Sequence, residues 1–206
     1  MHRYFKPIVF LAALIPLGRL VWLGLHAGLG ANPIEFITHS TGDWTLTFLL
    51  ITLAVTPLRK ITRQYWLIRY RRMLGLFAFF YGCLHLMTYV WLDKFFDVHE
   101  MLHDIAKRKF ITAGMTAFTL MIPLALTSTK WSIRKLGKRW QVLHRLIYFS
   151  AAAGVIHYIW LVKADLKKPL EYAFVLGLLL LYRVVVWVIA KVKVDRVARA
   201  AVQSAS

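Results

Sequence analysis

The chain has 206 residues, 59% of them hydrophobic, and its mean hydropathy is +0.58. This composition is too apolar for an ordinary soluble domain and is typical of a membrane protein. The net charge is +18, from 27 lysines and arginines against 9 acids. These basic residues lie in short loops between apolar runs, which argues against a nucleic-acid-binding domain. The single cysteine, Cys83, excludes a disulfide framework and a cysteine-based metal motif.

Six apolar runs approach the length of about 20 residues that a membrane-spanning helix needs. In chain order they are residues 8–26, 44–58, 73–92, 110–127, 141–162 and 170–190. The second run is the shortest, and it could extend back into the loop before it. There is no internal repeat and no room for a domain outside the membrane. We therefore expect one all-α domain over residues 1–206, an integral membrane bundle of six transmembrane helices.

The loops between the runs predict the orientation of the bundle. One side carries most of the basic residues, and the loops of the opposite side carry nearly all of the acids. Because cytoplasmic loops are enriched in lysine and arginine, we expect both termini in the cytoplasm. The basic residues of that side are Arg3, Lys6, Arg59, Lys60, Arg63, Arg69, Arg71, Arg72, Lys130, Arg134, Lys135, Lys138, Arg139, Lys191, Lys193, Arg196 and Arg199.

Two histidines, His85 and His157, lie at matching depths in the third and fifth runs. His85 is 7 residues before Leu92, and His157 is 6 residues before Lys163. At about 1.5 Å per residue, each lies roughly 10 Å below the outer boundary of the membrane. Two histidines on different helices can ligate one haem iron from opposite faces. A lone histidine in a span often only hydrogen-bonds a neighbouring group, but a pair at one depth favours haem.

The residues around this pair suit a flat apolar macrocycle. Small residues leave room for it, and aromatic residues can flank it. These are Gly82, Ala151, Ala152, Ala153 and Gly154, and Tyr81, Tyr89, Tyr158 and Trp160.

His144 lies near the cytoplasmic end of the fifth run, 13 residues before His157. Thirteen helical positions separate the two by about 20 Å and by roughly 140° around an ideal helix. They share a face only if the helix is irregular, for which Gly154 is the candidate position. The third run offers Gly75 and Leu76 at this depth, with Arg71 and Arg72 just below, but no histidine. His144 therefore ligates a second haem with an unusual partner, binds a quinone or flavin, or caps the helix entrance.

The remaining charged residues receive simpler interpretations. His99 and His103 have the spacing of a metal site, but a solvated amphipathic turn explains them better. His26 and His39 bracket an outer loop. Three arginines in or near the spans are expected to snorkel toward the membrane surface: Arg19, Arg145 and Arg183. The spans hold no acids in their interiors, which argues against a proton pump and most ion-coupled transporters.

Four stretches together resemble the MsrQ (YedZ) family. They are LIRYRRMLGLFAFFYGCLHLMTY, ALTSTKWSIRKLGKRWQVLHRLIY, IHYIW and GLGANPIEFITHSTGDWTLTFLLITLAVTPLR. The resemblance extends over nearly the whole chain. That family supplies the haem-binding membrane subunit of a bacterial system that repairs methionine sulfoxide in periplasmic proteins. It belongs to the ferric reductase-like transmembrane superfamily, which also contains the NADPH oxidases.

The resemblance implies a multi-pass protein of the bacterial inner membrane that transfers electrons. They would come from the quinol pool or a cytosolic flavin reductase, pass through haem b, and leave to MsrP, a periplasmic molybdopterin reductase. FMN binding is implied by the resemblance alone. The positions matching the family's haem-associated histidines are His85, His144 and His157. Oxidase members of the superfamily carry two histidines on each of two helices. Here the Arg71 and Arg72 region takes the place of the first histidine on the third helix, so the number of haems, one or two, stays open.

Three functions are compatible with these residues. The first is the electron-transfer subunit, in which Arg71, Arg72 and Arg145 suit the anionic groups of a cofactor and no side chain is catalytic. The second is a stand-alone ferric or superoxide-forming reductase. It would need a nucleotide-binding domain, but no GxGxxG motif follows a strand and the tail after Ala190 is too short for one. The third is a non-redox permease or membrane scaffold.

Overall fold

The computed structural model describes residues 5–162 and 164–205, with side chains as far as residue 196. Arg3 and Lys163, which the orientation and depth arguments use, lie outside the described residues, as does the side chain of Arg199. The described residues form helices and no strand. The elements are α1 (Phe5–Leu25), α2 (Pro33–Thr62), η1 (Tyr65–Leu67), α3 (Ile68–Met87), η2 (Thr88–Asp93), α4 (Val98–Lys107), α5 (Lys109–Leu126), α6 (Lys130–Leu136), α7 (Lys138–Leu143), α8 (Leu146–Leu161) and α9 (Lys167–Ala205).

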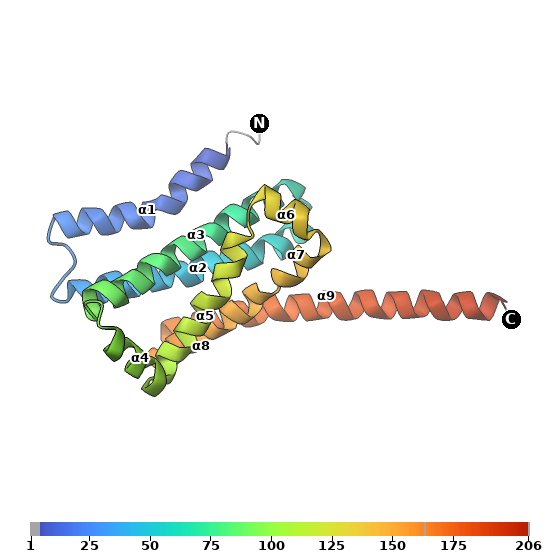
Figure 1. Cartoon of the computed structure of the whole chain (residues 1–206). Helices are drawn as coiled ribbons and strands as arrows, with labels where there is room; N and C mark the ends of the chain where they lie inside the picture. The colour runs from blue at the N-terminus through green and yellow to red at the C-terminus, as the bar shows by residue number, and fades with distance from the viewer. Residues whose placement is uncertain (1–4, 163, 206) are drawn as a thin grey trace.

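The expected all-α membrane architecture is confirmed. Six helical segments are long and apolar enough to cross a bilayer: Phe5–Leu25, Pro33–Thr62, Tyr65–Asp93, Lys109–Leu126, Lys138–Leu161 and Lys167–Arg196. Figure 1 shows α2, α3, α5 and α8 as the centre of the bundle, with α1 to one side and α9 extending beyond the other helices. The short α4 lies at one end of the bundle, and α6 and α7 lie at the opposite end.

The second span is longer than the apolar run, because α2 begins at Pro33 and includes most of the expected loop. Proline suits the first turn of a helix, and the side chain of Asn32 caps that turn by accepting a hydrogen bond from the Glu35 amide. His39 therefore lies within a helix, and the expectation of a loop there was wrong. This extension brings the carbonyl of Thr38 alongside α3, where it becomes part of the site.

The fifth span is interrupted at His144 and Arg145, which form a turn between α7 and α8. The helix irregularity for which Gly154 was the candidate position therefore lies at His144 and Arg145, between the end of α7 and the start of α8. Gly154 has a packing role: a Cβ there would lie 2.9 Å from Leu46 of α2. Small residues that let helix backbones approach closely are the usual packing device inside membranes.

Tyr81 ties α1 to the core. Pro16 lies inside α1 and lacks the amide proton that an unbroken helix needs, and Figure 1 shows α1 bent. The Tyr81 hydroxyl, fully buried on α3, donates to the Ala13 carbonyl at 2.9 Å and accepts from the Leu17 amide at 3.2 Å. It is therefore inserted between two groups that would otherwise bond each other, and it satisfies both without water.

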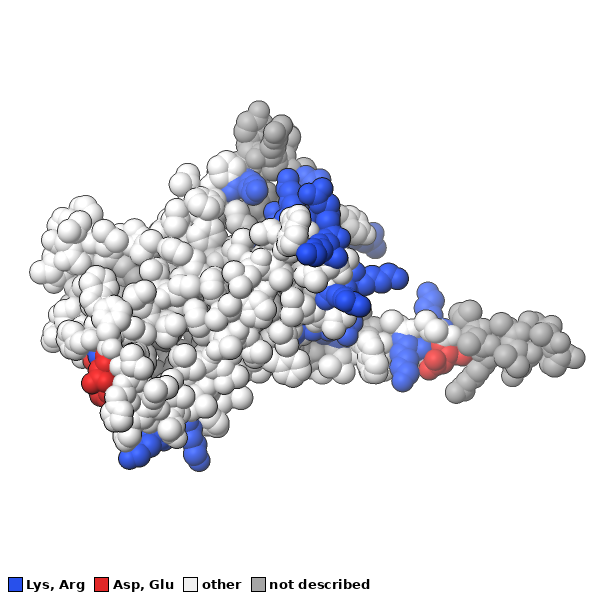
Figure 2. All heavy atoms as spheres, viewed as in Figure 1, with Lys and Arg blue, Asp and Glu red and all other residues white. Residues whose placement is uncertain are grey.

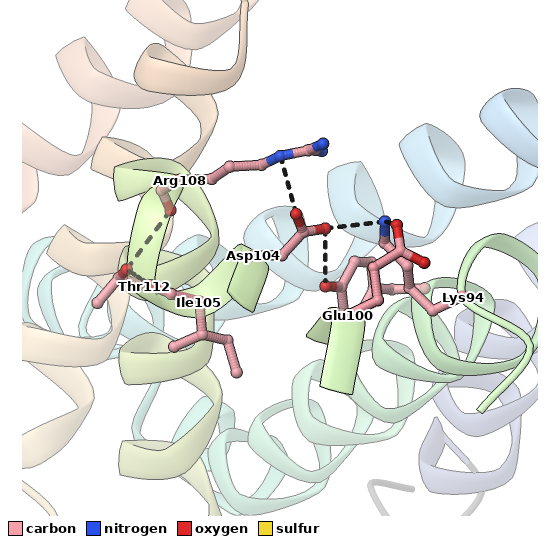
Figure 3. A network of polar contacts seen from close by, with 7 residues as sticks. Lys94, Glu100, Asp104, Ile105, Arg108 and Thr112 are labelled. Atoms are coloured by element: carbon pink, nitrogen blue, oxygen red, sulfur yellow. Dashed lines mark hydrogen bonds and ion pairs between the residues drawn. The ribbon is translucent and has the colours of Figure 1, made fainter. Parts of the chain in front are cut away.

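Charge separates along the bundle. Figure 2 shows most of the visible Lys and Arg near the α6–α7 end and on α9, while the opposite end carries both acidic and basic residues. At the α4 end, Lys94 lies 2.9 Å from Asp104, and Arg108 contacts the other carboxylate oxygen at 3.0 Å. Figure 3 shows Asp104 between these two cations. The hydrogen bond from Lys94 and the charge of Arg108 lower the pKa of Asp104, while Glu100 and Asp104 raise the pKa of Lys94. This network fixes α4 across the end of the bundle.

We expect Tyr81→Phe to lower the free energy of unfolding by about 1–2 kcal/mol, because the Ala13 carbonyl and the Leu17 amide would lose a shared partner. Unfolding of the detergent-purified protein measures this change. Tyr70→Phe is the matched control, since Tyr70 is buried on the same helix but its hydroxyl forms no hydrogen bond with another described residue. Equal losses in the two variants would show that the bridge contributes nothing.

Candidate functional site

His85 of α3 and His157 of α8 face each other inside the bundle. Their ring centroids lie 6.0 Å apart and the ring planes meet at 77°. Two imidazoles that held one metal ion between them, with metal–nitrogen bonds of about 2 Å, would have ring centres about 6 Å apart. The observed separation fits such a pair of ligands.

Backbone carbonyls fix the tautomer and orientation of both rings. Nδ1 of His85 donates to the Thr38 carbonyl at 2.9 Å, and Nδ1 of His157 donates to the Phe110 carbonyl at 2.6 Å. A carbonyl oxygen can only accept, so each Nδ1 carries the proton and each Nε2 keeps its lone pair. A hydrogen bond of this kind to the outer nitrogen is the usual support of a metal-ligating histidine. The donor set therefore fits haem iron.

Two glycines make room for the imidazoles. A Cβ at Gly42 of α2 would lie 3.1 Å from Cε1 of His85, and a Cβ at Gly114 of α5 would lie 2.8 Å from Nδ1 of His157. Neither glycine was singled out from the sequence, because nothing local marks a glycine that faces a ring on another helix. Each histidine thus has a carbonyl partner and a glycine on a neighbouring helix, so four helices build the site.

The residues expected to surround the macrocycle have other contacts. A Cβ at Gly82 would lie 3.5 Å from the Phe118 ring, and Ala151 is fully buried among the helices. Tyr81 bridges α1, as described above, and Trp160 is half exposed at the bundle surface. The hydroxyl of Thr88, the first residue of the π-helical η2, donates to the carbonyl of His85. A π-helical turn next to His85 is an irregularity often found at functional sites.

The remaining predicted residues come together at the other end of the bundle. His144, Arg71, Arg72 and Arg145 all line one cavity of about 470 Å³, with Gly75 and Leu76 in its wall as the depth argument expected. Nδ1 of His144 donates to the Trp140 carbonyl at 3.0 Å, and its buried Nε2 has no partner among the described residues. The cavity has the size of a small-molecule site, and it offers a free imidazole nitrogen and three cations.

The other histidines form no further site. His99 and His103 lie on α4, and the described residues hold no group of three or more potential metal ligands. His26 stacks on Trp22 with ring centroids 3.8 Å apart, and its Nδ1 bonds the Trp22 carbonyl. Two clusters therefore carry the candidate chemistry: the His85–His157 pair and the His144 cavity.

The chain is similar to known membrane proteins over most of its length. A family model described as ferric reductase like transmembrane component matches residues 41–155. A Herminiimonas arsenicoxydans protein named protein-methionine-sulfoxide reductase heme-binding subunit MsrQ is 58% identical over 182 residues, which cover 87% of this chain and 84% of that protein. Proteins of the same name from Bordetella parapertussis and Azospira oryzae are 54% and 56% identical, over 88% and 87% of this chain and 89% and 78% of theirs. No solved structure matches the chain.

We expect Gly114→Ala to reduce the amount of haem retained by the purified protein several-fold, because the new methyl group displaces the His157 ring from the Phe110 carbonyl. The haem absorbance per mole of protein measures this. Gly177→Ala is the matched control, since a Cβ at that position of α9 meets nothing within 4 Å. Full haem content in Gly114→Ala would show that the position of this ring does not matter.

Proposed function

The chain belongs to the MsrQ family of ferric reductase-like transmembrane components, and on that premise we propose that it is the haem-binding electron-transfer subunit of a bacterial methionine sulfoxide reductase system. The observation that carries the proposal is the pair of imidazoles 6.0 Å apart, each with Nδ1 bound to a carbonyl. A stand-alone reductase or a permease has no comparable support in the structure.

His85 and His157 hold a b-type haem in this proposal. When bound, the haem supplies reversible one-electron chemistry. The chain contributes placement: the Thr38 and Phe110 carbonyls orient the rings, and Gly42 and Gly114 let them reach the iron. Carbonyl acceptors also increase the electron donation of each imidazole, which favours the oxidised metal. No side chain needs to make or break a bond to substrate.

The His144 cavity holds a second carrier, and its residues fit three kinds. His144 Nε2 suits a second haem iron or a hydrogen bond to a quinone or flavin ring. Arg71, Arg72 and Arg145 suit haem propionates or the phosphate of FMN. A carrier at this place would serve the cytoplasmic part of the membrane, because His144 lies 13 residues, about 20 Å at the helix rise, from His157.

The charge asymmetry supports an orientation of the bundle. We place the basic end, with both termini, in the cytoplasm and the α4 end in the periplasm of a bacterial inner membrane. By family resemblance, the electron donor would be the quinol pool or a cytosolic flavin reductase, which would act near the His144 cavity. The acceptor would be MsrP, which would meet the periplasmic face near His85 and His157 and perform the sulfoxide chemistry.

His85→Ala and His157→Ala should each abolish the absorbance of this haem, because one axial ligand and its anchoring bond are lost together. Spectra of the oxidised and dithionite-reduced protein measure this. His103→Ala is the control, since His103 is exposed on α4 and should leave the spectrum unchanged. A spectrum of wild-type intensity and position in His85→Ala would exclude His85 as a ligand.

His144→Ala separates a second haem from a quinone or flavin. If His144 ligates a second haem, the haem content should fall by about half while the remaining absorbance keeps its shape. If it binds quinone or flavin, the spectrum should stay intact and the rate of haem reduction by quinol or reduced flavin should fall at least tenfold. Wild-type haem content together with wild-type reduction by both donors would contradict a carrier at this cavity.

A further inference from the structure

Arg183 lies inside the sixth apolar segment, 8 residues before Lys191, and it does not reach for the membrane surface as the sequence suggested. Its Nη2 donates to the Leu53 carbonyl of α2 at 2.9 Å. Leu53 is four residues before Pro57, which lacks the amide that would normally bond this carbonyl. Arg183 therefore satisfies a backbone carbonyl that Pro57 leaves without its usual partner.

This bond uses one donor of Arg183 and leaves its charge without an acid. Arg183 Nε is buried with no hydrogen-bond partner among the described residues. The same holds for Arg59 Nε and the Thr56 hydroxyl on α2. Leu53, Thr56 and Arg59 recur every three residues and so share one face of α2, the face that Arg183 meets.

The surroundings of these groups are cationic. Arg71 interacts electrostatically with both Arg59 and Arg183, and the Arg183 guanidinium lies 4.8 Å from the centre of the Tyr148 ring. Among described residues, every ion pair involves Lys94, Arg108 or Lys168, none of which belongs to this cluster. Several guanidinium groups with no carboxylate inside a bilayer are costly, and an anion removes that cost.

We propose that Thr56, Arg59 and Arg183 bind the phosphate group of an anionic phospholipid between α2 and α9. These residues offer two buried N–H groups and one hydroxyl without hydrogen-bond partners, and Arg71 interacts electrostatically with both arginines. Guanidinium and hydroxyl donors are the chemistry that recognises a phosphate. A lipid fits better than a free ion, because α9 exposes Val184, Val185 and Trp187 beside the site. These apolar side chains would contact the acyl chains. None of the three proposed ligands lines the His144 cavity.

Native mass spectrometry of the full-length protein tests the site, with phosphatidylglycerol, phosphatidylcholine and inorganic phosphate as separate probes. Wild type should bind phosphatidylglycerol at least tenfold more tightly than phosphatidylcholine. Arg59→Gln and Arg183→Gln should each weaken phosphatidylglycerol binding about tenfold, as expected for the loss of a charge-assisted bond. Arg69→Gln is the matched control, because Arg69 is basic and exposed near the same end of the bundle.

Thr56→Val keeps the test decisive if Arg183→Gln fails to fold, because it removes a donor without changing charge or the bond to Leu53. It should weaken phosphatidylglycerol binding several-fold. Three results would overturn the proposal: equal affinity for the two lipids, an equal loss in Arg69→Gln, or inorganic phosphate occupying the site as tightly as phosphatidylglycerol. The last result would assign the site to a free anion.

Discussion

The account depends on two hydrogen bonds, from Nδ1 of His85 and His157 to the carbonyls of Thr38 and Phe110. Each carbonyl belongs to a different helix from its histidine: Thr38 lies in α2 and Phe110 in α5. Each bond therefore couples the orientation of the ring to the packing of two helices. If a ring rotated away, its Nε2 would leave the space between α3 and α8, and a backbone carbonyl would lose a partner in a medium without water. The bonds therefore preorganise the rings before any cofactor is present.

The bilayer explains several other features of this fold. Prolines interrupt the backbone hydrogen bonds of α1 and α2, and in both helices a side chain from another helix bonds backbone groups near the proline. Tyr81 bridges the Ala13 carbonyl and the Leu17 amide near Pro16, and Arg183 bonds the Leu53 carbonyl that Pro57 leaves open. In water such groups would be hydrated, but within lipid they require protein partners. The same requirement makes the buried donors on Arg59 and Arg183 informative, because polar groups at this depth rarely remain without partners.

Much of the architecture could be predicted from the sequence because span length and loop charge are local properties. The depth match of His85 and His157 needed only helix rise and the position of the span ends. The same counting placed Gly75 and Leu76 at the depth of His144, and both line the cavity there, although the cavity itself could not be read from the sequence. The family resemblance supplied the cofactor and partner assignments, which residue spacing alone leaves open.

The parts that could not be predicted depend on contacts between helices. Gly42 and Gly114 matter because each faces an imidazole from another helix, and no sequence spacing encodes that relation. The sequence allowed the second span to extend back into the loop before it, but the start of α2 at Pro33 could not be fixed, because polar residues around His39 resemble a loop. Arg183 was expected to snorkel toward the membrane surface. Its actual bond could not be predicted, because the acceptor is a carbonyl that a proline leaves without a partner on a different helix.

An experimental density map of the haem-loaded protein tests the central claim most directly, through the two distances from iron to Nε2 of His85 and His157. Both should be about 2 Å, the length of a metal–imidazole bond, with Nδ1 of each ring still bound to its carbonyl. An iron ligated by any other residue, or by one of these histidines alone, would contradict the account.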